Sequence, residues 1–171
     1  MTITNDLHDL SCHLQRSIRY HKARERFFGS WSSFNSFLSL IMGSAVVVGL
    51  LSDHLPDYVA LGAGTAVAVS QSLELVLQWS TKARDHQAFA SEFAALERVL
   101  ASRDAPDAAF LRDLRAEVLT IEAREPPIKR YLDLICHNQV ARALGSNDLA
   151  RVTWWQRLTA QYRPGDSAGS A

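Results

Sequence analysis

The sequence has no surplus of charge, few cysteines and few residues that break helices. Its 18 lysines and arginines balance 18 acidic residues, whereas proteins that bind nucleic acid normally carry a basic surplus. We therefore expect no nucleic-acid partner. The two cysteines, Cys12 and Cys136, form no CxxC pair and suit a reducing compartment. With five prolines, eight glycines and no series of alternating strand-like segments, the chain is expected to be all-α.

Motifs that carry chemistry are absent as well. There is no Ser/His/Asp signature, no GxGxxG sequence and no P-loop. Cys136 and His137 are adjacent, but no further ligands follow at the spacing that a metal site requires. Residues 1–26 are polar and charged, unlike a secretory signal peptide. We expect neither an enzyme nor a bound cofactor or metal.

The sequence does contain two long windows that are almost free of charge. No charged residue occurs from Phe27 to Ser52, and Glu74 is the only one from Tyr58 to Trp79. A helix of about 20 residues spans the roughly 30 Å of a hydrocarbon core. A soluble hairpin buried in a bundle is the alternative, but its helices would need a polar face, which neither window provides. We predict a transmembrane hairpin at residues 27–81, with spans at about 31–51 and 58–79 and with membrane lipid as a partner.

Positive charges flank this hairpin only on its outer sides. Basic residues precede the first window, from Arg16 to Arg26, and Lys82 and Arg84 follow the second, whereas the connecting turn carries acids and a histidine. Because Lys and Arg resist translocation, both outer flanks are expected to stay in the cytoplasm. We predict a multi-pass protein of the bacterial inner membrane, with both termini cytoplasmic.

Aromatic and polar residues are ordered by depth along the predicted spans. Folding the chain at Leu55 brings Trp31 and Trp79 level, as anchors at the cytoplasmic interface. Glu74 then lies about one turn inside that interface, where it either forms hydrogen bonds or lines a pore. The polar residues predicted to lie in the membrane or to line a pore are Asn35, Thr65, Ser70, Gln71 and Glu74.

Small residues recur every four positions in the second span. The predicted helix-packing row consists of Ala60, Gly64, Ala68 and Ser72, and a second row of small residues lies beside it. Such rows allow the backbones of membrane helices to approach closely. Two rows exceed what one hairpin partner uses, which favours a homo-oligomer; packing within a single hairpin is the alternative.

The rest of the chain is predicted to be helical and cytoplasmic. Residues 1–26 have apolar side chains at helical spacing and are expected to form an amphipathic basic helix. The second span is expected to continue as a helix to Leu100, and residues 82–145 to form a helical bundle. The stretch from Asp104 to Asp107, with Pro106, is expected to end one helix and start the next; Pro126 is expected to bend the chain, and Gly145 to end the helix that follows. Around that bend we predict a structural polar cluster of Glu122, Glu125, His137 and Asn138.

Residues 146–163 form a segment rich in aromatic residues and arginine. Its apolar face consists of Trp154, Trp155, Leu158 and Tyr162, and the basic residues near it are Arg151, Arg157 and Arg163. Such a face suits the surface of an anionic inner leaflet. Packing of the aromatic residues on the cytoplasmic bundle is the alternative. Residues 164–171 are predicted to be a disordered tail.

Two stretches of the chain resemble the SLATT-domain family. The basic helix carries Arg19-Tyr20-His21-x-x-Arg24 before the two adjacent spans. The later stretch from Ile121 to Pro127, followed by Leu134 to Asn138, is similar to SLATT-like membrane proteins of proteobacteria. The resemblance covers roughly residues 10–145 and concerns the layout of the chain more than any one motif.

The resemblance implies a two-span bacterial membrane protein that acts as a pore-forming or membrane-disrupting effector of an antiphage defence system. No nucleotide-binding or synthase domain is fused to this chain, so we expect the trigger to come from a nucleotide signal or a sensor protein. Two spans cannot enclose a pore alone, and several copies would have to assemble. The alternative function is a non-conducting membrane scaffold whose cytoplasmic helical bundle docks a partner protein.

Overall fold

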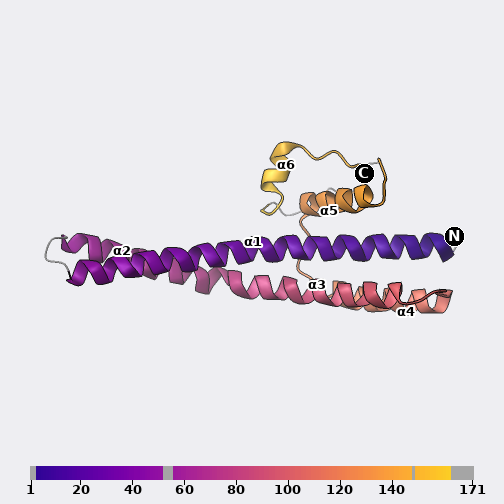
Figure 1. The fold of residues 1–171 in the computed structure, drawn as a ribbon, viewed down its shortest axis with the longest axis horizontal. Coiled ribbons are helices and arrows are strands. Elements are labelled where there is room, and N and C mark those ends of the chain that lie inside the picture. Colours follow the sequence, from indigo (N-terminus) through magenta and orange to yellow (C-terminus); the bar gives the residue numbers. More distant parts are fainter. Residues whose placement is uncertain (1–2, 52–55, 148, 163–171) are drawn as a thin grey trace. The chain divides into compact units, whose positions relative to one another are not determined.

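The computed structural model describes residues 3–51, 56–147 and 149–162, and all regular structure within these ranges is α-helical. The helices are α1 (Ile3–Leu51), α2 (Asp57–Leu77), α3 (Trp79–Ala101), α4 (Ala108–Glu122), α5 (Arg130–Ala143) and α6 (Trp154–Thr159) (Figure 1). The all-α prediction is confirmed. The chain divides into two compact units: unit 1 comprises Met1–Arg24 and His86–Ala171, and unit 2 comprises Glu25–Asp85.

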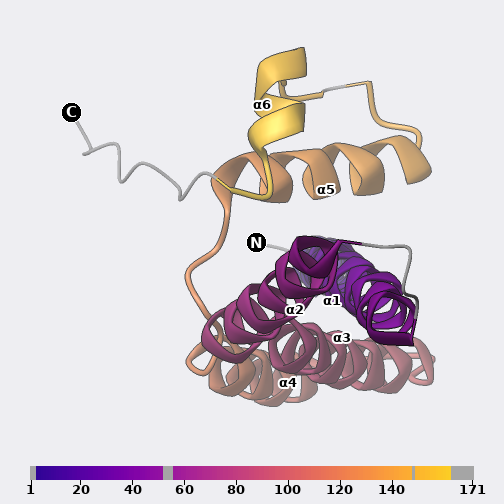
Figure 2. The same cartoon turned by 90° about the vertical axis from the view of Figure 1, so that its left-hand side faces the viewer.

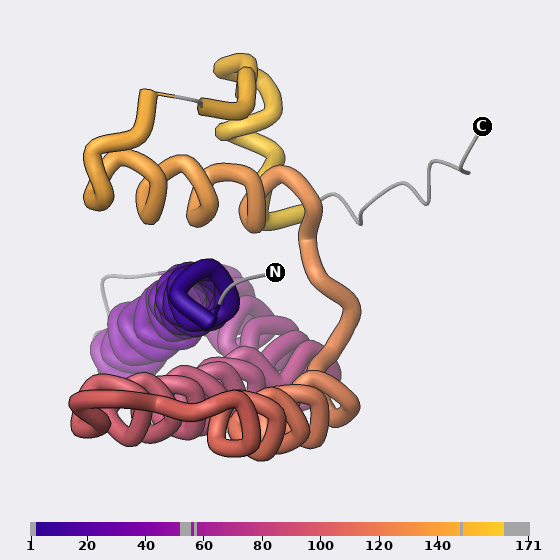
Figure 3. Tube along the Cα trace, turned by 90° about the vertical axis from the view of Figure 1, so that its right-hand side faces the viewer, coloured from indigo at the N-terminus to yellow at the C-terminus, as the bar shows by residue number. Residues whose placement is uncertain are grey.

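Unit 1 is built around the apolar stripe at the start of α1. Leu10 and Leu14, one turn apart, are 4% and 0% exposed. Within this unit, α5 lies on one side of α1, and α3 and α4 lie on the other (Figure 3). Apolar side chains every three or four positions place a continuous stripe on one face of a helix, and burial of these stripes joins the helices. The other buried members of this core are Phe93, Leu96, Leu100, Leu111, Leu114, Val118 and Ile121.

Local signals in the sequence set the ends of the helices in unit 1. The side chain of Asp107 accepts a hydrogen bond of 2.8 Å from the Phe110 N–H and caps the start of α4, within the stretch predicted to start a helix. Two adjacent prolines, Pro126 and Pro127, lie in the connection between α4 and α5. Gly145, with φ of 77°, ends α5 in the left-handed conformation that favours glycine. The Ser146 N–H then bonds to the Ala141 carbonyl at 2.9 Å.

A second apolar cluster holds α5 and α6 in unit 1. It consists of Tyr20, Leu132, Cys136 and Ala160, all of which are buried. The side chain of Asn138 adds two hydrogen bonds to the backbone of Ala150, donating at 2.7 Å and accepting at 2.9 Å. These contacts explain why the short helix α6 lies beside α5 (Figure 2).

In unit 2, the later part of α1 lies alongside α2 (Figure 1). The rings of Trp31 and Trp79 stack with their centroids 5.7 Å apart. This is the register expected from a fold of the chain at Leu55, which itself lies outside the described residues. The predicted basic helix and first span are parts of one helix, α1, because no residue between them interrupts its backbone bonding.

Two helical stretches, Ile3–Leu51 and Tyr58–Ala101, are long and apolar enough to cross a membrane. In the most apolar window of each stretch, 6% of the residues are buried. Large apolar side chains there are exposed in the single chain, for example Leu50 at 75% and Leu75 at 77%. The core helix of a soluble protein would bury such side chains.

The second of these stretches is interrupted, contrary to the prediction of one continuous helix from the second span to Leu100. Gln78, between α2 and α3, has φ of 52° and ψ of 45°, which is the left-handed region. The backbone bonds from Gln78 N–H to the Glu74 carbonyl and from Lys82 N–H to the Gln78 carbonyl are retained. Glutamine is a good helix former, so its type gives no warning of this break.

The close approach of α1 and α2 depends on Gly49. A Cβ atom at this position would lie 3.1 Å from the Cβ of Ala60, which is shorter than a normal carbon–carbon contact. A Cβ atom at Gly43, also in α1, would meet nothing within 4 Å. The two glycines therefore form a matched pair, one at a helix contact and one in open space.

Gly49→Leu is expected to destabilise unit 2 relative to Gly43→Leu by about 1–3 kcal/mol, because only the first leucine forces the two helices apart. Both changes gain a similar helix propensity of about 1 kcal/mol, so that gain cancels. The measurement is titration of the detergent-solubilised protein with sodium dodecyl sulfate, followed by tryptophan fluorescence. Equal midpoints for the two variants would contradict the close approach.

Candidate functional site

Polar side chains meet across the contact between α1 and α2. The hydroxyl of Ser70 donates a hydrogen bond to the side-chain carbonyl of Asn35, and both residues are 6% exposed. Ser39 joins them, with its oxygen 3.3 Å from that of Ser70. Gln71 donates to the Ser39 hydroxyl at 2.6 Å. In apolar surroundings such bonds satisfy polar groups that would otherwise be costly to bury.

The carboxylate of Glu74 binds to the backbone at the break between α2 and α3. Its Oε1 accepts a hydrogen bond of 3.1 Å from the Ser80 N–H, which lies in the first turn of α3. N–H groups in the first turn of a helix lack helical partners, and a carboxylate there also matches the positive end of the helix dipole. Glu74 therefore acts as a cap for α3.

The residues predicted to line a pore all have hydrogen-bond partners within the chain. Thr65 donates to the carbonyl of Leu61 at 2.8 Å, and Asn35, Ser70, Gln71 and Glu74 have the partners described above. Asn35 and Ser70 are buried between the helices, whereas Thr65 and Gln71 are exposed. Thr65 bonds only within α2, whereas the exposed Gln71 would have to give up its bond to Ser39 of α1 to face a neighbouring molecule through its amide N–H.

The predicted row of small residues has two halves, one that faces α1 and one that is exposed. Ala60 lies against Gly49, and a Cβ atom on Gly64 would lie 3.8 Å from a methyl group of Val46, so this half of the row faces α1. The other half, Ala68 and Ser72, is exposed. The Ser72 hydroxyl donates to the carbonyl of Ala68 at 2.8 Å.

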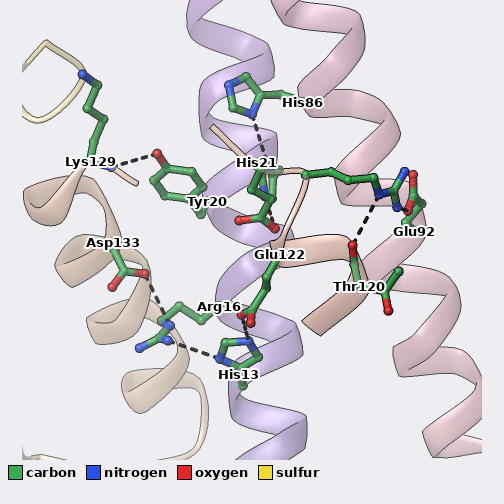
Figure 4. Close-up of polar contacts among 12 residues, drawn as sticks. His13, Arg16, Tyr20, His21, His86, Glu92, Thr120, Glu122, Lys129 and Asp133 are labelled. Carbon is green, nitrogen blue, oxygen red and sulfur yellow. Dashed lines mark hydrogen bonds and ion pairs between the residues drawn. The ribbon is translucent and has the colours of Figure 1, made fainter. Parts of the chain in front are cut away.

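Unit 1 contains a buried group of two histidines and a glutamate, which come from α1, α3 and the connection after α4. The Nδ1 atoms of His21 and His86 lie 2.8 Å apart, and these residues are 1% and 4% exposed. Nε2 of His21 lies 3.1 Å from Oε1 of Glu125. Figure 4 shows His86 and His21 pointing toward each other from the two helices. The group therefore joins three parts of unit 1 that are distant in sequence.

His21 has a polar group on each side of its ring. Its Nε2 contacts the Glu125 carboxylate without hydrogen-bond geometry. On the other side, the Nδ1 atoms of His21 and His86 share one hydrogen, which either ring can supply. The pKa of His86 is lowered from 6.5 to about 3, chiefly by burial, with smaller contributions from the nearby His21 and Arg24. His86 is therefore neutral at physiological pH.

Two neighbours in α1 attach other segments of unit 1 to this group. The hydroxyl of Tyr20 accepts a hydrogen bond of 2.9 Å from the Lys129 N–H at the start of α5, as seen in Figure 4. Burial raises the pKa of Tyr20, so the phenol stays protonated. Arg24 donates from one nitrogen to the backbone and side-chain oxygens of Gln161, at 2.8 and 2.9 Å. Burial lowers the pKa of Arg24, but a guanidinium remains charged.

The four residues of the predicted polar cluster are placed against several different partners. Glu122 lies 2.8 Å from Nε2 of His13, Glu125 lies against His21, and Asn138 binds Ala150. His137 is exposed and lines a surface groove. Both glutamates thus contact α1, which differs from the predicted bonding of the four residues with one another.

The groove that contains His137 has a volume of about 560 Å³ and lies between α1 and α5. His8, Cys12 and His13 line its other side, and Nε2 of His8 is 3.5 Å from the sulfur of Cys12. Burial raises the pKa of the Cys12 thiol, with a further contribution from Asp9, so the nucleophilic thiolate is disfavoured. Among the described residues, no three His, Cys, Asp or Glu side chains are arranged to hold a metal ion.

The aromatic side chains of the 146–163 segment are exposed on unit 1. Trp154 and Trp155 are 61% and 62% exposed, and their rings stack with centroids 4.1 Å apart. Leu158 and Tyr162 are 61% and 59% exposed. Of the two predicted placements, packing of this face onto the helices of the same chain does not occur in unit 1.

The buried histidine pair is not among the site residues predicted from the sequence, although the sequence contains a signal for it. His21 follows Leu7 and Leu14 at intervals of seven residues, and His86 precedes Phe93 by the same interval. A histidine that continues an apolar stripe is expected to be buried and to need a polar partner.

Comparisons of the chain with protein-family models, with curated proteins and with solved structures found no match.

Proposed function

We propose that this chain is an integral membrane protein that crosses the bilayer twice, with both termini in the cytoplasm, and that its assembled copies make the membrane leaky. The observation that carries the membrane assignment is the 6% burial of the most apolar window in each long helical stretch. Exposure of such windows to water would be unfavourable by roughly 25 cal/mol per Å² of apolar surface. A hydrocarbon surrounding removes that cost.

The positive-inside rule supports the proposed orientation. In the sequence, Lys22, Arg24 and Arg26 precede the first span and Lys82 and Arg84 follow the second, whereas Asp53 and Asp57 fall between the two spans. The test is labelling of Tyr58→Cys in a Cys12→Ser, Cys136→Ser background with a thiol reagent that cannot cross membranes. We expect labelling from the periplasmic side of spheroplasts. Labelling only after lysis would contradict the orientation.

The effector role is supported by the resemblance to SLATT-domain proteins and by the surfaces left open on α2. In the resembling stretch, Tyr20, His21 and Arg24 are 4%, 1% and 8% exposed, so these residues stabilise unit 1. On α2, the small residues Ala68 and Ser72 and the polar residues Thr65 and Gln71 are exposed. Small residues suit close contact with a second copy, and polar residues suit a lumen once several copies assemble.

The test of the effector role is induced expression in bacteria loaded with a dye that reports membrane potential. We expect depolarisation and growth arrest, and we expect Gln71→Leu to reduce both while the protein still inserts. Leu61→Ala, a change on the exposed surface of the same helix, serves as the control. Normal potential and growth with fully inserted protein would argue strongly against a pore.

A non-conducting scaffold is the second candidate, and one observation favours it. All five polar residues predicted to line a pore are bonded within the single chain, including the Glu74 carboxylate that caps α3. A scaffold predicts that Gln71→Leu leaves function intact, whereas changes on the exposed surfaces of α4 or α5 abolish it. The mass of the purified protein in detergent, with and without candidate nucleotides, separates a triggered oligomer from a scaffold of constant stoichiometry.

A further inference from the structure

The exposed aromatic face of α6 is held in a defined orientation by the opposite side of the same segment. Ala160 is 2% exposed and packs in the cluster with Tyr20, Leu132 and Cys136. At its start, α6 has a capping box in which Thr153 and Gln156 exchange side-chain and backbone hydrogen bonds. At its end, Gln161 receives both hydrogen bonds from Arg24. The face is therefore a rigid part of unit 1, presented outward.

The charge on this segment differs from that of the whole chain. Residues 149–162 contain no acidic residue, whereas the complete chain has equal numbers of acids and bases. Arg151 and Arg157 lie in this range and are exposed. Arginine next to an apolar surface attracts an anion and also tolerates partial desolvation. The segment thus combines a local positive charge with an apolar surface.

We propose that the face formed by Trp154, Trp155, Leu158 and Tyr162, with Arg151 and Arg157 beside it, docks on an anionic lipid bilayer. Tryptophan and tyrosine are enriched where bilayers meet water, because their rings are apolar and their N–H or O–H groups remain hydrated. Each arginine near an anionic leaflet raises the equilibrium constant for docking roughly five-fold. The inference rests on the proposed function, because the two spans attach the chain to a bilayer.

The experiment uses the full chain with Trp31→Phe and Trp79→Phe, which leaves Trp154 and Trp155 as the tryptophans of the sequence. This variant is reconstituted into vesicles of phosphatidylcholine, either alone or mixed with phosphatidylglycerol. The acyl chains of the lipids are brominated near the headgroup. We expect blue-shifted emission and quenching that are stronger with phosphatidylglycerol. Arg151→Gln with Arg157→Gln is expected to weaken both effects, as is high salt. Arg112→Gln with Arg115→Gln is the matched control and should change neither.

A second reporter separates failure of the inference from failure of the proposed function. In the Trp154→Phe, Trp155→Phe variant, bromolipid quenching of Trp31 and Trp79 reports insertion of unit 2. Quenching of that pair without quenching of Trp154 and Trp155 overturns lipid docking but leaves the membrane assignment intact. If neither pair of tryptophans is quenched, both lipid docking and the membrane assignment are overturned. Emission that shifts with protein density but not with lipid composition assigns the face to another protein and also overturns the inference.

Discussion

Phe93→Ala is expected to destabilise unit 1 by about 3–5 kcal/mol. Phe93 is 0% exposed and packs in the core that joins α1, α3 and α4. Its ring also stacks on the imidazole of His21, with centroids 5.7 Å apart and planes inclined by 19°. Truncation therefore removes apolar contacts and opens a cavity beside buried polar groups.

The thiol of Cys136 provides a reporter for this change, because it is 1% exposed and lies in unit 1. In a Cys12→Ser background, Phe93→Ala should increase the rate of Cys136 modification by roughly a hundred-fold or more under native conditions. Val99→Ala is the control on the same helix, since Val99 is 44% exposed and should cost less than about 0.5 kcal/mol. Similar rates for the two variants would show that Phe93 contributes little to the core.

Lowering the pH from about 7.5 to about 5 is expected to cost unit 1 about 2 kcal/mol through His86 alone. Its folded pKa of about 3 lies below the ordinary value of 6.5, so the unfolded chain binds more protons between these two values. The stability that depends on neutral His86 is complete above about pH 6.5 and decreases by up to about 1.4 kcal/mol for each unit below it. The groups around His86 are His21, Tyr20 and Arg24 of α1, and Glu125 reaches it through His21.

The variant that isolates this effect is His86→Gln, whose amide can donate or accept a hydrogen bond opposite Nδ1 of His21 but does not titrate. The measurement is the rate of Cys136 modification at each pH, divided by the rate of a small free thiol. In the wild type, the relative rate of Cys136 modification should rise as the pH falls, because unit 1 unfolds more readily. In His86→Gln, much of this pH dependence should be lost. His137→Gln, at an exposed position of α5, should behave like the wild type. Parallel profiles for His86→Gln and the wild type would show that His86 does not cause the acid sensitivity.

Local signals and periodic stripes predicted much of the fold. The leucines at positions 10 and 14 and the stripe of α4 are buried because their spacing places them on one helix face. Asp107 begins a helix and Gly145 ends one, since capping and left-handed geometry depend on a few neighbouring residues. The register of Trp31 with Trp79 follows from a short connection between two helices of equal rise.

The candidate site was harder to predict, because its partners are distant in sequence. His21 and His86 are 65 positions apart, and only the packing of α1 on α3 brings them together. The contact of Glu125 with His21 depends on the packing of α4 on α1, whereas the proline that follows Glu125 specifies only a bend. The break at Gln78 is accompanied by a bond from the Ser80 N–H to the carboxylate of Glu74, one turn before Gln78, and glutamine itself gives no signal for the unusual conformation.

That break makes two positions interdependent. In an uninterrupted helix, the Ser80 N–H would bond to the Val76 carbonyl, but here it bonds to the carboxylate at position 74. An apolar residue at 74 leaves this N–H without its acceptor unless residue 78 returns to right-handed geometry. Natural variation at these two sites should consequently be correlated, with an acidic residue at 74 accompanying a left-handed residue at 78, and with both features lost together.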